Sequence, residues 1–554
     1  MFHLTDTPEV CLIMIMVLGI IECILFVVSY VLTILYFVHM FQLNSYRCKA
    51  QYKWMSEHIG RVVPAVTGVV VCTVGLILAW ADDITSYGIN SYINALPAHV
   101  TGLITVIIVF FAIMLILYRP VKAKKKLVFT PRVMRLVATI IVLTIIMIAL
   151  SLIRGERLVV LIILPLIYGI APFTVTIAAE CNRPVEYGVK VHYINDAKHI
   201  LAQCPELKIV GITGSYGKTS VKYYLHDLLS AKYNVLMTPE SYNTPMGVVK
   251  TIREQLTAAH QVFICEMGAR HVGDIKEICD IVHPHDGIIT SIGYQHLETF
   301  RSLDNIVNTK YELFDALPKE GLRFINGDNE IIRKYNRLDG VITYGLNEGN
   351  SYRASSLSVN EKGSTFTVTA PDGTTQEFFT SLIGKHNVLN ILGAIAAAHT
   401  YGISLSDLRL PVRKLRGVPH RLQLIDRGSV TVIDDAYNSN PNGCRMALDT
   451  VALFDACKII VTPGMVELGT REDEYNEEFG REAAAVCDYI VLVGEKQTQA
   501  IAKGVRSADF PEEALYITET LQDAVAYAYA INGSRMKEFT KKIILLENDL
   551  PDNY

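Results

Sequence analysis

The sequence has little that would support a metal cluster or a disulfide framework. Its eleven cysteines include no C-x-x-C pair and show none of the spacings typical of zinc sites. No internal repeat or low-complexity segment is evident, which excludes a repeat architecture. The net charge of -4 over 554 residues is small, and we expect no nucleic-acid partner. With the larger part of the chain cytoplasmic, as argued below, the cysteines are expected to be reduced thiols.

Charge is scarce in the first 180 residues, which are dominated by Ile, Leu, Val and Met, whereas the rest has an ordinary soluble composition. Five stretches meet the criterion of about 20 apolar residues for crossing a bilayer. They cover residues 10–39, 61–81, 98–118, 133–153 and 158–179. The first is too long to be a signal peptide. We therefore predict an α-helical transmembrane bundle of about five spans over residues 1–180.

Lysine and arginine are absent from the first ten residues and from the 82–97 loop, but are frequent in the 41–60 and 119–132 loops. The positive-inside rule then predicts a multi-pass protein of the cell membrane with an outside N-terminus and a cytoplasmic segment after residue 180. The basic run at 122–126 is interpreted as a topology determinant, with anionic lipid headgroups as an alternative ligand. Glu22 lies inside the first span. Either it has a function there or it is a neutral carboxyl hydrogen-bonded within the bundle.

The remaining chain has the pattern of two α/β units. Residues 181–206 are predicted to be a juxtamembrane linker with one short helix. Domain 207–416 is predicted to alternate strands and helices, with a hairpin around Asp372 and a buried helix at 387–400. Domain 417–554 is predicted to be a Rossmann-like doubly wound sheet. The predicted strands are Val262–Cys265, Gly287–Thr290, Arg323–Ile325, Val430–Ile433, Ile459–Thr462, Tyr489–Val493 and Ile543–Leu546.

Residues 211–220 read GITGSYGKTS and lie between an apolar strand, Leu207–Val210, and an amphipathic helix, Val221–Leu229. Backbone N–H groups of such a loop, with the helix N-terminus, form a cradle for polyphosphate. Ile212 stands where the strict Walker pattern has its first glycine. We expect ATP and Mg²⁺ as cofactors, with Lys218 on the β/γ-phosphates and Thr219 on the metal. The expected nucleotide-binding residues of the loop are Gly214, Ser215, Gly217, Lys218, Thr219 and Ser220.

Glu266 follows the predicted strand Val262–Cys265 directly. A carboxylate at the C-terminal end of a parallel strand points into the crevice where α/β sheets bind ligands. There it could hold Mg²⁺, although taken alone a glutamate at this place is more often solvated or an N-cap. His296 and Lys310 would not be selected from the pattern alone.

Ten motifs in this order resemble those of the Mur ligase family, in particular its MurF branch, which adds D-Ala-D-Ala to the muramoyl tripeptide. The resemblance covers roughly residues 195–554. The motifs are GITGSYGKTS, ESYNTPMG, EMGARHVGDI, HLETF, TKYELF, INGDN, GKHNVLNILGAIAAA, HRLQ, DDAYNSNP and GMVELG.

The resemblance implies roles for individual residues. Lys310 would be a carbamylated metal ligand beside Glu266 and His296, so that the implied catalytic set is Lys218, Lys310, His296 and Glu266. Positions lining the adenosine pocket would be Asn326, Asp328, Asn387 and Asn390. From the C-terminal domain, Arg421, Asp434 and Asp435 would approach the nucleotide. Asn243, Tyr437 and Asn438 would lie near the substrates, whereas His386 is as easily structural as functional.

The resemblance implies an ATP-dependent acid–amino-acid ligase in peptidoglycan precursor synthesis, which forms an amide through an acyl phosphate. The partners implied are an amine (an amino acid or dipeptide), a carboxylate-bearing peptide or lipid-linked precursor, and membrane lipids. Two alternatives remain open. One is a ligase on another substrate, such as a polyglutamate-type peptide, and the other is a non-catalytic nucleotide-binding membrane sensor.

The sequence departs from the family in three places. Only about 25 residues separate the last predicted span from the phosphate loop, too few for a domain that grips a UDP-sugar. Tyr216 stands where the family usually has Asn, and residues 544–551 read ILLENDLP in place of a GSR motif that helps hold the acceptor. We therefore expect either a carboxylate substrate presented at the membrane, for example on a polyprenyl carrier, or a bundle that serves only as an anchor.

Overall fold

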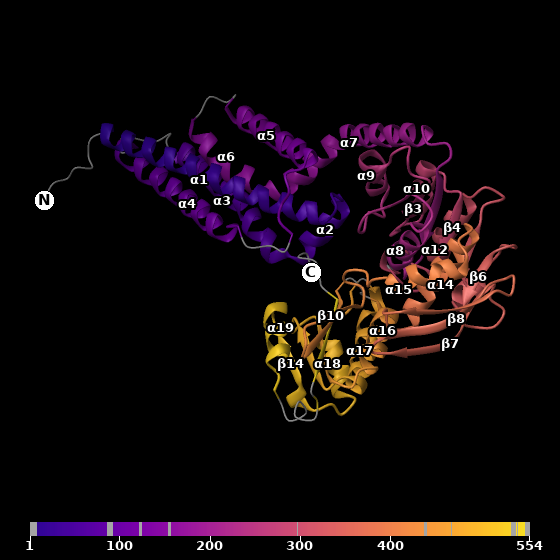
Figure 1. Cartoon of the computed structure of the whole chain (residues 1–554). Helices are drawn as coiled ribbons and strands as arrows, with labels where there is room; N and C mark the ends of the chain where they lie inside the picture. Colours follow the sequence, from indigo (N-terminus) through magenta and orange to yellow (C-terminus); the bar gives the residue numbers. More distant parts are fainter. Residues whose placement is uncertain are drawn as a thin grey trace. The chain divides into compact units, whose positions relative to one another are not determined.

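The computed structural model of the protein describes residues 8–85, 92–120, 125–152, 157–295, 297–436, 440–466, 468–532, 539 and 541–548. The chain divides into two compact units, one ending at Val189 and the other comprising Lys190–Leu550. Figure 1 shows the first unit in indigo to magenta and the second in magenta to yellow. The first is entirely helical in its described residues, and the second contains two sheets.

The helices of the N-terminal unit are α1 (Pro8–Leu43), α2 (Cys48–Glu57), α3 (Ile59–Thr85), α4 (Tyr92–Leu117), α5 (Pro131–Leu152), α6 (Arg157–Gly169) and α7 (Ala171–Ala202), the last of which continues into the second unit. Two stretches, Met16–Leu43 and Pro131–Leu150, are long and apolar enough to cross a membrane. Two helix pairs qualify only if each bent pair is one span. The described residues therefore contain two to four candidate spans, not the five that we predicted.

The fifth predicted span, 158–179, is broken. Helix α6 and helix α7 meet at a bend of 66°. The break coincides with Gly169 and Pro172, which weaken the helix by entropy and by loss of a backbone donor, respectively. On α1, Glu22 is fully buried, and neither of its carboxylate oxygens has a hydrogen-bond partner in the described part of the chain. The interpretation of Glu22 as a hydrogen-bonded carboxyl is therefore not supported.

Residues 181–202 differ from the predicted linker with one short helix, because α7 is continuous to Ala202. The C-terminal end of α7 is amphipathic and packs its apolar side into the core of the second unit, where Ala197 is fully buried. On the polar side, Asp196 accepts a hydrogen bond from Arg253 Nε at 2.5 Å. The polar residues of this segment therefore form the outer side of a helix whose apolar side packs on the second unit.

The central domain is built on a nine-stranded sheet in the order β2-β3-β1-β4-β5-β6-β7-β8-β9. Its strands are β1 (Lys208–Thr213), β2 (Val235–Met237), β3 (Val262–Glu266), β4 (Asp286–Ile289), β5 (Arg323–Asn326), β6 (Ile342–Gly345), β7 (Tyr352–Asn360), β8 (Gly363–Thr369) and β9 (Thr375–Thr380). The strands from β2 to β7 pair in parallel, and β7, β8 and β9 pair antiparallel. The register sets Ile212 beside Glu266, so the strand end that enters the phosphate loop adjoins the end of β3.

Helices cover both faces of this sheet. They are α8 (Lys218–Leu229), α9 (Pro245–Gln255), α10 (Asp274–Val282), α11 (Leu297–Phe300), α12 (Leu303–Asp315), α13 (Glu330–Tyr335), α14 (Lys385–Thr400) and α15 (Leu405–Lys414). Helices α8, α14 and α15 share one hydrophobic core with the sheet, and α9, α10 and α12 share the other. Within β3, Ile264 belongs to the first core and Phe263 to the second, as the alternation of side chains along a strand requires.

The C-terminal domain has a six-stranded sheet in the order β10-β11-β15-β12-β13-β14. Its elements are β10 (Gln423–Asp426), β11 (Val430–Asp435), α16 (Pro441–Ala452), β12 (Cys457–Thr462), η1 (Gly469–Arg471), α17 (Glu472–Val486), β13 (Tyr489–Val493), α18 (Gln499–Arg506), η2 (Glu512–Ala514), β14 (Leu515–Thr518), α19 (Leu521–Ala530) and β15 (Lys542–Glu547). Only β10 pairs antiparallel. The predicted doubly wound character holds, because α16, α17 and α18 pack on one face and α19 on the other.

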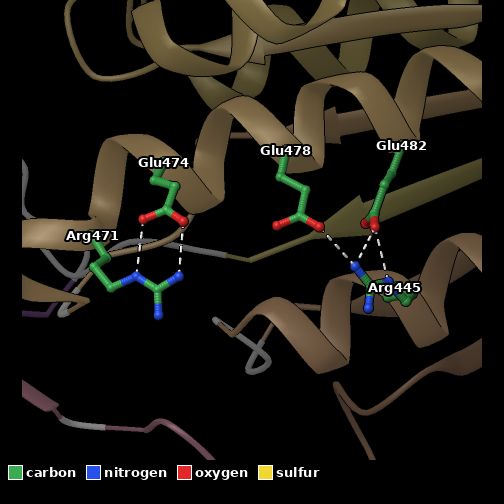
Figure 2. A network of polar contacts seen from close by, with 5 residues as sticks. All are labelled: Arg445, Arg471, Glu474, Glu478 and Glu482. Atoms are coloured by element: carbon green, nitrogen blue, oxygen red, sulfur yellow. Dashed lines mark hydrogen bonds and ion pairs between the residues drawn. The ribbon is translucent and has the colours of Figure 1, made fainter.

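Two sets of surface ion pairs involve α17: one connects it with α16, and the other lies at its own N-terminus (Figure 2). Arg445 of α16 donates to Glu478 at 3.1 Å and to Glu482 at 2.5 Å, and Arg471 grips both carboxylate oxygens of Glu474 at 2.8 and 2.9 Å. About half of the Arg445 side chain is exposed. Exposed pairs of this kind contribute little stability, so the hydrophobic contacts beneath them hold the two helices together.

Candidate functional site

The phosphate loop leaves β1 and enters α8 at Lys218. Glycine is needed at two positions between β1 and α8, because the backbone has a positive φ at both: +151° at Gly214 and +81° at Gly217. Both also approach neighbours closely. A Cβ at Gly214 would lie 2.2 Å from Thr290 Oγ1, and one at Gly217 would lie 2.5 Å from Asn390 Oδ1.

Hydrogen bonds from the end of β4 fix the middle of the loop. Ser215 N donates to the Ser291 carbonyl at 2.7 Å, and Gly293 N donates to Ser215 Oγ at 3.0 Å. The Tyr216 carbonyl accepts from Thr290 Oγ1 at 2.5 Å and from Ser291 Oγ at 2.9 Å. The Tyr216 ring lies against Gly293, where an added Cβ would come within 2.5 Å of Cε2. The loop is therefore preorganised, which lowers the entropy cost of binding a polyphosphate.

Lys218 is bonded to the loop that precedes it. Its Nζ donates to the carbonyl of Gly214 at 2.7 Å and to that of Ser215 at 3.1 Å. Burial lowers the pKa of Lys218 to about 8, against the attraction of Glu266 and with added repulsion from Arg421. Arg421, from the start of the C-terminal domain, is thus within electrostatic reach of the phosphate loop.

Three polar side chains contact Glu266, two from α8 and one from the loop before α9. Its Oε1 accepts from Thr219 Oγ1 at 3.0 Å and from Asn243 Nδ2 at 3.2 Å. Its Oε2 lies 3.0 Å from Lys222 Nζ. The Asn243 carbonyl also accepts from Gly268 N at 2.7 Å, so the loop that carries Asn243 is fastened to the end of β3 from both sides.

These groups suit Mg²⁺. Burial by itself would raise the pKa of Glu266, but Lys222 and then Lys218 outweigh it and hold the pKa below its usual range. The ionised carboxylate and the Thr219 hydroxyl are hard oxygen donors, the kind that Mg²⁺ prefers. Within the described residues no three His, Cys, Asp or Glu side chains form a metal-binding group, and the expected ligand His296 lies outside those residues.

Lys310 lies on α12 with only 3% of its surface exposed. Burial, with repulsion from Lys218, holds the pKa of Lys310 well below its usual range, so Lys310 loses its proton more readily than an exposed lysine. Two residues on, Glu312 accepts from Gly273 N at 2.8 Å and from Lys276 N at 2.9 Å. The glutamate of the K-x-E-L-F motif therefore caps the N-terminus of α10, which anchors the loop after Glu266 to the helix that carries Lys310.

Asn326 and Asp328, expected at the adenosine pocket, organise their own turn. Asn326 Oδ1 accepts from Asp328 N at 3.0 Å. The Asp328 carboxylate accepts from Leu346 N at 2.6 Å and from Asn350 Nδ2 at 3.1 Å. These contacts hold the ends of β5 and β6 together, and the binding role of both residues stays a prediction.

Asn387 and Asn390 differ in their surroundings. The Asn387 amide is engaged within the fold, accepting from the Tyr224 hydroxyl at 2.9 Å and donating to the Ile383 carbonyl at 2.8 Å. Ser220, on the first turn of α8, lies near the same Tyr224 hydroxyl. Asn390 instead lies against the phosphate loop, as its approach to Gly217 shows. Of the two, Asn390 is the better placed for a nucleotide.

In the C-terminal domain, the two expected aspartates support the segment that contains Arg421. Asp434 pairs with His420 Nδ1 at 2.8 Å, and buried Asp435 accepts from Leu422 N at 3.0 Å. The residues on either side of Arg421 are therefore fastened to the end of β11. Tyr437 and Asn438, expected near the substrates, lie outside the described residues, as does His296.

Sequence reasoning missed Lys222 and Glu312, which contact the site, and Glu547, which is buried inside the C-terminal domain. Glu547 ends β15 and is fully buried, accepting from Cys444 Sγ at 2.8 Å and from Thr462 Oγ1 at 3.0 Å. Burial raises the pKa of Glu547 to about 8. An acidic residue within the apolar run ILLE was the available signal, since a buried carboxyl in a strand needs partners.

Glu547 should make the stability of the protein depend on pH. The folded protein holds a proton that the unfolded chain releases above pH about 4.5, so this contribution is full below that pH and is lost as the pH rises through about 8. The slope is at most about 1.4 kcal/mol per pH unit. We expect Glu547→Gln to flatten the fall in melting temperature between pH 5 and 8. If Glu547→Gln and the wild type show the same fall in melting temperature over this range, the assignment of the raised pKa to Glu547 is contradicted.

Comparison with known proteins agrees with this geometry. The chain matches family models described as "Mur ligase middle domain" over residues 212–398 and "Mur ligase, glutamate ligase domain" over residues 420–536. It is 30% identical to the UDP-N-acetylmuramoyl-tripeptide--D-alanyl-D-alanine ligase of Escherichia coli over 353 residues, which cover 62% of this chain and 77% of that enzyme. It is 30% identical to the Bacillus subtilis enzyme of the same name, and the match spans 49% of this chain and 59% of that enzyme.

The fold of the chain is also similar to that of a solved MurF structure. MurF from Acinetobacter baumannii superposes with a TM-score of 0.58 and 26% identity, over 65% of this chain and 77% of that one. The N-terminal helical unit lies outside both family matches. The chain therefore belongs to the Mur ligase family, whose members use ATP and Mg²⁺ to form amide bonds.

Proposed function

We propose that this protein is an ATP-dependent ligase of the MurF type that joins a peptide carboxylate to an amine in peptidoglycan precursor synthesis. The observation that carries the proposal is the convergence of Lys218, Thr219 and ionised Glu266 at one end of the central sheet, with buried Lys310 behind them. The names of the matched relatives support the same chemistry.

The reaction requires no nucleophile from the protein. The substrate carboxylate attacks the γ-phosphoryl group of ATP, and an acyl phosphate forms with loss of ADP. The amine then attacks the acyl carbon, phosphate leaves, and an amide results. The protein contributes position and charge. Lys218, with Arg421 within electrostatic reach of it, would stabilise the negative charge of the phosphoryl oxygens.

Magnesium, when bound, neutralises phosphoryl charge. Glu266 and Thr219 would hold it, together with Lys310 once that amine has been carbamylated. The lowered pKa of Lys310 supports this step, because only a neutral amine adds to CO₂. His296 is proposed as a further ligand.

The substrate is proposed to reach the site at a membrane surface. Helix α7 ends at Ala202 and β1 begins at Lys208, so the chain has no room for a UDP-sugar-binding domain between them. The apolar helices of the N-terminal unit support membrane attachment. We therefore favour a lipid-linked carboxylate substrate over a soluble one.

Phosphate release with a panel of substrates tests the ligase proposal. We expect release from ATP that requires both a muramoyl-peptide carboxylate and an amine such as D-Ala-D-Ala. Lys218→Ala should lower the rate by at least about 100-fold, since it removes a charge aimed at the transferred phosphoryl group. Lys232→Ala, beyond the far end of α8, is the control. Tight ATP binding without release on any pair would favour a nucleotide sensor.

Lys310 gives a separate test. Lys310→Ala should lose most activity and recover part of it with millimolar formate or acetate, because these anions replace the missing carbamate carboxylate. The rate of phosphate release measures both effects. A fully active Lys310→Ala protein would contradict the assignment of Lys310 to the metal site.

Deletion of residues 1–189 tests whether the carboxylate substrate is lipid-linked or soluble. The remaining chain corresponds to a compact unit, so we expect it to keep ATP binding but to lose at least about tenfold in activity on a lipid-linked carboxylate in vesicles. Full activity on a soluble UDP-linked peptide would defeat the lipid-linked proposal, while leaving the ligase assignment intact.

A further inference from the structure

Lys222 is a lysine with no access to solvent. It lies on α8 one turn after Lys218, and its side chain is 0% exposed. Lysine is almost never fully buried unless it is paired. Its Nζ lies 3.0 Å from Glu266 Oε2 and donates to the Glu240 carbonyl at 2.5 Å. One ammonium group thus joins α8 to two other segments.

The first of these contacts gives the two oxygens of the Glu266 carboxylate different partners. Oε2 forms an ion pair with Lys222 Nζ and has no hydrogen-bond partner among the described residues, whereas Oε1 accepts hydrogen bonds from Thr219 Oγ1 and Asn243 Nδ2. The carboxylate is 1% exposed, so it cannot turn toward water. The ion pair at Oε2 and the two hydrogen bonds at Oε1 together fix its orientation.

The second contact fixes a strained turn. Glu240 has φ +42°, a conformation that residues other than glycine seldom adopt. Such a conformation persists only where its surroundings hold it, and the hydrogen bond from Lys222 to the Glu240 carbonyl is one such restraint. Three residues on, the same turn presents Asn243 to Glu266 Oε1.

We propose that Lys222 is a positioning residue that directs one oxygen of Glu266, beside Thr219, toward the magnesium ion of the bound nucleotide. This rests on the proposed function only in requiring that the protein binds Mg-nucleotide. Lys222 itself does not touch the nucleotide. Its effect passes through Glu266 and through the turn that carries Asn243.

The test measures metal dependence of nucleotide binding in the full-length protein, without turnover. A non-hydrolysable ATP analogue is titrated at increasing Mg²⁺ and again in EDTA. We expect Lys222→Met to raise the Mg²⁺ concentration at half-saturation by about tenfold, because a buried carboxylate that loses its charged partner is no longer held in one orientation. Binding in EDTA should change less than about twofold. Lys250→Met, which removes a half-exposed lysine bonded to Tyr242 in the same region, is the matched control and should match wild type.

A double-variant comparison covers the case in which Lys222→Met does not fold. Lys222→Met/Glu266→Gln removes both charges, and its Mg²⁺ dependence is compared with that of Glu266→Gln alone. If Lys222 acts through Glu266, the two agree within about threefold. A larger difference, or a Lys222→Met protein with wild-type Mg²⁺ dependence, overturns the inference. A wild-type protein that binds no nucleotide instead contradicts the proposed function.

Discussion

The candidate site depends on one negative charge kept inside the fold. A carboxylate without solvent is strongly unfavourable unless opposite charge and hydrogen bonds compensate for it. Glu266 is compensated by the lysine side chains that α8 brings to the end of β3. The same carboxylate receives the hydroxyl of Thr219 and the amide of Asn243. The phosphate loop, the end of β3 and the 240–247 segment are therefore arranged around a single group.

Much of the fold could be predicted because its signals are local. The phosphate loop, β3 and the hairpin around Asp372 follow from glycine placement and from apolar runs or alternation. Short strands such as β2 and β10 carry too few residues for such a pattern. Helix α7 was missed beyond residue 180 because its polar face resembles a linker, and its apolar face is recognisable only once the surface it packs on is known.

The roles of individual side chains were harder to predict. A lysine on an amphipathic helix is usually solvated, and only the tertiary structure shows that Lys222 is buried against Glu266. Glu312 shares a motif with Lys310, yet its contacts show a helix cap. In the N-terminal unit, composition located the helices but could not show that α6 and α7 bend at their junction. His296, Tyr437 and Asn438 remain predictions.

The contact between Tyr216 and Gly293 links two positions 77 residues apart in the chain. The aromatic ring occupies the space that any side chain at 293 would need. A larger side chain at either position would therefore clash with the other residue unless that residue moved. Descendants of this sequence that retain a bulky aromatic in the phosphate loop should therefore also retain glycine at 293, and those that lose the ring are released from that restriction, so the two positions should covary as the lineage diverges.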